Sequence, residues 1–162
     1  MQSKRDVELL IRRARPDDSE RLSQIARAAK AHWGYPEAWL VAWTPLLSIT
    51  PEYVEHQLVY VGARDHAMVA FYALEPRGER WSLEHFWVDP RWHGRGVGRR
   101  MFAHALAQVR AVRPGIMVIE ADPYAAGFYA RMGAQRKGTV PAPVDGDPER
   151  TLPVFEVAVE AP

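Results

Sequence analysis

The sequence of 162 residues contains no cysteine, so no disulfide bond can hold the fold together. A hydrophobic core has to supply the stability, and a chain of this length is long enough to bury one. We therefore expect one domain over residues 1–162. The lack of disulfides also fits a cytoplasmic protein.

The sequence also lacks a strong excess of charge of one sign. Lys and Arg number 21 against 20 Asp and Glu, which gives a net charge of +1. This balance does not favour nucleic acid or an acidic membrane surface as a partner. The longest uncharged run, residues 38–51, is too short and too interrupted by proline to span a bilayer, and residues 1–7 do not have a signal-peptide pattern. We expect no membrane association, no repeats, and a monomer or homodimer.

Glycine is concentrated in one segment, LEHFWVDPRWHGRGVGRR, at residues 83–100. Leu83–Val88 is apolar and aromatic enough for a buried strand, and a helical pattern begins at Val97. Between them, three glycines stand at alternate positions, next to the free backbone N–H groups of the helix start. Arginines in the first turn have the wrong sign for the helix dipole unless an anion lies there. The segment therefore predicts a pyrophosphate site.

The glycine spacing distinguishes this loop from other phosphate-binding loops. A dinucleotide fingerprint requires G-x-G-x-x-G, and a P-loop requires Lys followed by Ser or Thr; neither pattern is present. The sequence Arg91-x-x-Gly94-x-Gly96 resembles the Q/R-x-x-G-x-G/A acetyl-CoA motif of the GNAT acetyltransferase superfamily. The alternative explanation of the loop is a glycine turn that is needed only for close packing.

A second segment, DPYAAGFYARMGA at residues 122–134, predicts a short helix. Asp122 can cap it, and Gly133 suits a left-handed exit. Tyr129 falls on the apolar side, so its ring should face the protein body. The segment resembles the GNAT signature N-x-x-A-x-x-F/Y-Y-x-x-x-G-F, with Asp122 in place of Asn and Ala134 in place of the aromatic residue. Asp122 can accept hydrogen bonds but cannot donate them as the Asn amide does. This replacement therefore affects the contact with pantetheine that the resemblance implies.

The resemblance implies the GNAT fold: an α+β domain with a splayed, mostly antiparallel mixed sheet of six to seven strands and about four helices. Strands are expected at residues 7–14, 58–63, 67–74, 83–88, 115–121, 135–140 and 152–160, and helices at residues 19–31 and 52–57, from residue 97, and at residues 122–134. The resemblance further implies that the pantetheine of acetyl-CoA lies between the 83–88 and 115–121 strands. No metal is expected. Cofactor binding is assigned to Phe86, Trp87, Val88, Arg91, His93, Gly94, Arg95, Gly96, Val97, Gly98, Arg99, Asp122, Tyr124 and Phe128.

Aromatic residues crowd the segment AHWGYPEAWLVAW at residues 31–43. One interpretation is that these rings close the core over one end of the sheet. The other, which follows from the resemblance, is that His32, Trp33 and Tyr35 wall the site for the acceptor.

Acetyl transfer to an amine needs a base for the ammonium proton and an acid for the departing thiolate. The resemblance makes Tyr129 the acid, and a phenol with a pKa of about 10 is protonated at neutral pH. Strand alternation predicts that Glu84, Phe86 and Val88 share one face, which makes Glu84 the candidate base. His85, expected to be packed on the other face, Glu120 and a water chain are the alternatives.

Two functions are compatible with these residues. The first is direct transfer of an acetyl group from acetyl-CoA to a primary amine of a small molecule or peptide. The second is a non-catalytic module that binds or senses acyl-CoA. A phenol and a strand carboxylate favour catalysis, because a binding module needs only the loop and backbone.

Overall fold

The computed structural model describes residues 8–162, which form one seven-stranded sheet in the order β1-β2-β3-β4-β5-β7-β6. The strands are β1 Leu10–Arg13, β2 Leu58–Arg64, β3 Ala67–Arg77, β4 Arg80–Val88, β5 Gly115–Glu120, β6 Gln135–Pro141 and β7 Thr151–Val159. Among the strands described, only β4 and β5 pair in parallel, as a strand–helix–strand crossover requires. The mixed, mostly antiparallel sheet is confirmed. The expected start of the first strand at residue 7 lies outside the described residues.

Five α-helices accompany the sheet in the described part of the chain. They are α1 Ser19–His32, α2 Glu37–Ala42, α3 Pro51–His56, α4 Val97–Val112 and α5 Ala126–Arg131, with 3-10 turns at Pro16–Asp18, Pro90–Trp92 and Pro123–Ala125. The helix beyond the predicted four is α2, which forms inside the aromatic segment after Pro36. None of the helices described is long and apolar enough to cross a membrane.

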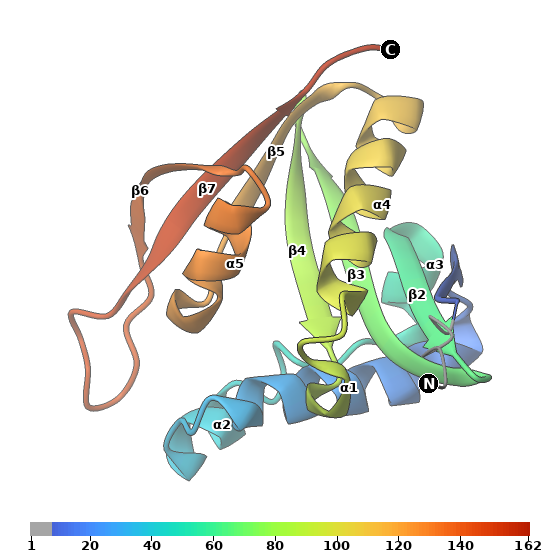
Figure 1. Cartoon of the computed structure of the whole chain (residues 1–162). Helices are drawn as coiled ribbons and strands as arrows, with labels where there is room; N and C mark the ends of the chain where they lie inside the picture. The colour runs from blue at the N-terminus through green and yellow to red at the C-terminus, as the bar shows by residue number, and fades with distance from the viewer. Residues whose placement is uncertain (1–7) are drawn as a thin grey trace, which may run out of the picture.

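Helices pack on both faces of the sheet (Figure 1), and each face carries a hydrophobic core. On one face α4 and α5 bury Met101, Phe102 and Tyr129 against the strands. On the other face α1 contributes Leu22 and Ile25, while α3 adds a smaller contact. Leu22 and Ile25 recur at helical spacing along α1, so the helix packs on the sheet through one apolar stripe.

The two parallel strands separate after a short contact. β4 and β5 pair only through Trp81 with Met117 and Ser82 with Val118, and the strands then diverge toward their carboxyl ends (Figure 1). Beyond Ser82 the edge of β4 that faces β5 has no strand partner. Because unpaired backbone N–H and C=O groups seek partners, this gap can receive an extended polar ligand.

A β-bulge in β4 changes the direction of one candidate side chain. His85 pairs with Ala73 and Leu83 pairs with Leu74, which leaves Glu84 without a partner on β3. An extra residue breaks the two-residue alternation. Trp81, Leu83 and Phe86 join the core under α4. Glu84 instead accepts from Ser82, which points to the opposite face, so the prediction that Glu84 shares a face with Phe86 is wrong.

Candidate active site

A cavity of about 940 Å³ occupies the space where β4 and β5 separate. It extends from the glycine loop before α4 to the α1–α2 segment and the β6–β7 loop. Of the predicted site residues, it is lined by Trp33, Glu84, Phe86, Trp87, Val88, His93, Gly94, Gly96, Val97, Gly98, Arg99, Asp122, Tyr124, Phe128 and Tyr129. Four others, His32, Tyr35, Arg91 and Arg95, are not part of its lining. Most of the predicted residues are therefore brought together around one space.

The glycines of the loop serve two different purposes. Gly94 and Gly96 have φ of +71° and +78°, which side chains other than glycine rarely adopt, and a Cβ at either position would meet no atom within 4 Å. A Cβ at Gly98 would instead lie 3.2 Å from the ring of Phe128. The close-packing explanation thus applies to Gly98, whereas Gly94 and Gly96 leave open space in front of their backbone.

Backbone N–H groups at the start of α4 border this open space. The first helical hydrogen bond runs from Arg100 N to Gly96 O at 3.2 Å, so the N–H groups of the three residues before Arg100 have no acceptor within the helix. Together with the helix dipole they form an arrangement that suits an anion such as a pyrophosphate. Of the arginines around this helix start, Arg95, Arg99 and Arg100, only Arg99 lines the cavity. Arg95 lies over the ring of Trp92, and Arg100 donates to the Leu9 carbonyl at 3.3 Å.

Asp89 holds the turn that leads into the glycine loop. Its buried carboxylate accepts from Arg91 Nη2 at 2.8 Å and from Arg21 Nη2 at 3.1 Å. These hydrogen bonds, that of Arg91 above all, lower the pKa of Asp89 to about 2. The guanidinium of Arg91 is thus paired with Asp89, and its role as a direct cofactor ligand stays a prediction.

Replacement of Asp89 with Asn should destabilise the fold in a pH-dependent way. Since the folded-state pKa lies below the usual value of about 3.9, ionised Asp89 stabilises the protein above that pH and loses this effect as the pH falls toward 2. Because Arg91 is exposed, we expect a loss of about 1 kcal/mol at pH 7. Urea unfolding of Asp89→Asn and wild type at pH 7, 4 and 2.5 measures this difference. A difference that stays constant over that range would contradict a role for the charge.

Tyr129 lies at the inner wall of the cavity, within an aromatic cluster. Its ring centroid is 6.0 Å from those of Phe86, Phe102 and Phe155 and 5.3 Å from that of Phe128. Burial, with a smaller contribution from the negative charge of Asp122, raises the pKa of the Tyr129 phenol above its usual value. The hydroxyl is therefore protonated at neutral pH, as a proton donor must be.

Three candidate bases line the same cavity, in different environments. Glu84 stands in the bulge, half-exposed, where Ser82 Oγ donates to it at 3.0 Å and Arg77 lies at 3.5 Å. Glu120 is exposed at the end of β5. His85 is buried, which lowers its pKa to about 4, and its Nδ1 accepts from Trp87 Nε1 at 3.1 Å. His85 is thus packed, as predicted, and its accepting nitrogen is occupied.

Asp122 is the centre of a hydrogen-bonding group on the other side of the cavity. It accepts from the backbone N of Tyr124 at 2.9 Å, so its predicted capping role is confirmed, here for a 3-10 turn. Its carboxylate also pairs with Lys30 Nζ at 2.6 Å and accepts from Tyr35 Oη at 2.9 Å. With these partners the carboxylate is engaged inside the protein, and its contact with pantetheine stays a prediction.

The aromatic segment divides into two groups. Trp33 stacks on Tyr124 at 5.4 Å with an angle of 10° between the rings, and it also lies near His93 of the glycine loop. His93 Nε2 in turn donates to the Val88 carbonyl at 3.1 Å. The second group, Tyr35 with Trp39 and Trp43, lies against Lys30 and the β6–β7 loop. Trp33 therefore borders the loop rather than standing beside Tyr35.

Two cations of the cavity were not predicted from the sequence. Lys30 lies 4.4 Å from the ring centroid of Trp43, and Arg150 lies 5.0 Å from the same ring. Burial lowers the pKa of Lys30 despite its pairing with Asp122. In the sequence, only the crowded aromatic residues indicated this part of the site, because the residues that meet here are far apart along the chain.

Comparison with known proteins agrees with this geometry. Residues 55–133 match the family described as acetyltransferase (GNAT) domain. PaiA N-acetyltransferase from Thermoplasma acidophilum, solved with coenzyme A, is 16% identical over 93% of this chain and 99% of that chain, with a TM-score of 0.74. The ribosomal-protein-S18-alanine N-acetyltransferase from Escherichia coli is 16% identical over 96% of both chains, with a TM-score of 0.72.

A GNAT family acetyltransferase from Brucella melitensis, solved with acetyl-CoA, is 19% identical over 95% of this chain and 90% of that chain, with a TM-score of 0.67. No curated protein matches the sequence at a significant level. The sequence match spans the glycine loop and the Tyr129 helix, and the fold agrees over nearly the whole chain. Residues 55–133 therefore match the acetyltransferase (GNAT) domain, and the fold of the chain is the GNAT fold.

Proposed function

We propose that this protein transfers an acetyl group from acetyl-CoA directly to a primary amine of a small molecule or peptide. One observation carries the proposal: a single cavity contains the open start of α4, the separated edges of β4 and β5, a protonated Tyr129 and the carboxylates of Glu84 and Glu120. The relatives solved with coenzyme A or acetyl-CoA support the choice of cosubstrate. Bound in this cavity, acetyl-CoA supplies the activated acetyl group.

The residues fit the site to this cosubstrate in two places. Gly94, Gly96 and the first N–H groups of α4 would hold the pyrophosphate, because open backbone and a helix start favour an anion. The edge of β4 beyond Ser82 would bind the amide groups of pantetheine, because β5 has left it. His93 already donates to the Val88 carbonyl, so pantetheine would bind backbone groups of β4 residues that precede Val88 in the sequence.

The side chains of the cavity would move two protons. An acceptor amine arrives as an ammonium ion and has to lose a proton before it attacks the acetyl carbon. Glu84 would take that proton, directly or through water, because its half-exposed carboxylate stands where β4 parts from β5. Tyr129 would give its phenolic proton to the leaving thiolate, and the N–H groups of β4 could donate to the developing oxyanion.

Replacement of Glu84 with Gln tests the base. We expect Glu84→Gln to lower kcat/KM for the amine near neutral pH by about 10²-fold or more, with a smaller deficit at alkaline pH because more of the amine arrives deprotonated. Steady-state acetylation measured from pH 6 to 10 checks this expectation.

The same pH series on Glu120→Gln is the matched control, since Glu120 also lines the cavity. A pH-independent deficit in Glu84→Gln would indicate positioning rather than proton transfer. No deficit would move the role to Glu120 or to water. If neither the wild type nor any variant acetylates amines while acetyl-CoA still binds, the protein is the non-catalytic acyl-CoA-binding module.

A further inference from the structure

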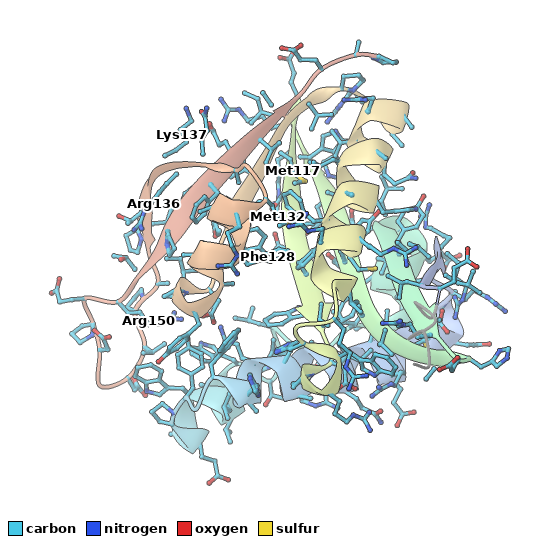
Figure 2. The ribbon with its side chains drawn as sticks, in the orientation of Figure 1. Met117, Phe128, Met132, Arg136, Lys137 and Arg150 are labelled. Carbon is cyan, nitrogen blue, oxygen red and sulfur yellow. The ribbon has the colours of Figure 1, made fainter. Side chains whose placement is uncertain are left out.

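Arg150 stands at the end of the β6–β7 loop, immediately before β7, and reaches the cavity from the side opposite the glycine loop. In Figure 2 it lies near the foot of α5, whereas Arg136 and Lys137 lie on the outer strand β6. The guanidinium lies 5.0 Å from the ring centroid of Trp43 and 5.8 Å from that of Tyr35. Arg150 thus belongs to the group of residues around Trp43 rather than to the exposed surface.

The hydrogen bonding of this guanidinium is incomplete. Arg150 Nη1 donates to the Ala142 carbonyl at 3.3 Å, but the buried Nη2 has no acceptor among the described residues. A buried donor without a partner is costly, and a charged one more so. Arginine is also the side chain best suited to bind a carboxylate through two parallel hydrogen bonds.

The nearby carboxylate of Asp122 does not supply the missing acceptor for Arg150. Asp122 is already paired with Lys30 and accepts the hydroxyl of Tyr35. Lys30 lies over the same Trp43 ring as Arg150. Lys30 and Arg150 therefore both lie beside Trp43 at this end of the cavity, and the carboxylate there, that of Asp122, is already engaged.

We infer that Arg150 binds a carboxylate carried by the acceptor amine, so that the substrate class is amines with both a carboxylate and an apolar body. This inference rests on the proposed acetyltransferase function. Trp43 and the neighbouring Leu46 and Leu47 line the cavity beside Arg150 and offer an apolar surface for that body. Glu84 and Glu120 line the same cavity and are the groups that would attract the ammonium end.

Matched acceptor pairs test the inference in the wild-type protein. The probes are L-phenylalanine, L-methionine and 6-aminohexanoic acid, each compared with its own carboxamide, which keeps the amine and removes the negative charge. Binding is measured by calorimetry on protein saturated with coenzyme A, and acetylation by kcat/KM with acetyl-CoA. We expect at least one acid to bind about tenfold to a hundredfold more tightly than its amide, the range for hydrogen bonds to a charged group.

Variants identify the anchor. Arg150→Gln should abolish the preference for the acid and leave binding of the amide unchanged, while Arg150→Lys should retain part of it. Arg136→Gln, which removes an exposed arginine of β6 outside the cavity, should keep the full preference. Thermal melting of each variant shows whether the fold is intact, and the wild-type comparison of acid with amide does not depend on any variant.

The outcomes separate this inference from the proposed function. Equal binding of acid and amide in every pair, or binding of neither member of any pair, overturns the carboxylate anchor even if other amines are acetylated. A preference that survives in Arg150→Gln overturns the assignment to Arg150. Acid-selective binding without any acetylation supports the anchor and contradicts the acetyltransferase function.

Discussion

Gly96→Glu is expected to weaken binding of coenzyme A by on the order of a hundredfold or more, because binding depends on close approach to open backbone. Gly96 is the N-cap of α4, and the space where its Cβ would stand is empty of protein atoms. A glutamate there fills that space and brings a negative charge to the place proposed for the pyrophosphate. Calorimetric titration with coenzyme A measures the effect.

A matched glycine separates this effect from backbone strain. Gly78, in the turn between β3 and β4, also has a positive φ, of +60°, and open space at its Cβ position. Gly78→Glu should therefore share the cost of a left-handed side chain, about 1–2 kcal/mol, and bind coenzyme A normally. Unchanged affinity in a folded Gly96→Glu protein would refute the pyrophosphate site.

Tyr129→Phe is expected to lower kcat by about 10²- to 10⁴-fold, the usual contribution of a general acid. The change removes only the hydroxyl and keeps the ring, which packs against Phe86 and Phe128. Affinity for coenzyme A and the melting temperature should therefore change little. Single-turnover acetylation at saturating amine and acetyl-CoA measures the chemical step.

The control for this substitution is Tyr60→Phe, which removes a phenol that donates to Gln108 outside the cavity. It should acetylate at the wild-type rate. Wild-type turnover in Tyr129→Phe would exclude the hydroxyl as proton donor, and a loss confined to cosubstrate affinity would assign it to binding instead.

The order of strands and helices was predictable because each element has a local pattern. The apolar period of α1 and α4, the glycine spacing before α4 and the alternation in β2 all depend on neighbouring residues. The aromatic segment was harder, since α2 is a short helix, its Trp39 donates to the distant Asp145 carbonyl, and Trp43 at its end lies against the distant Arg150. Local propensity alone does not specify a helix of that length.

The direction of Glu84 could not be predicted from alternation. Two-residue periodicity holds only while each residue faces one partner, and the bulge between Leu83 and His85 adds an unpaired residue. The register of β3 against β4 decides where that residue falls. The sequence of β4 alone does not contain this register.

The sequence by itself determined the GNAT fold, the glycine-rich start of α4 and the place of Tyr129 on its helix, because these features depend on motifs whose residues lie close together along the chain. Only the tertiary structure decided which charges meet. Asp122 pairs with Lys30, 92 residues earlier in the sequence, and Arg150 lies over Trp43. The physical reason is that the strength of such pairs depends on burial and distance, which the order of the strands in the sheet and the packing of its helices establish.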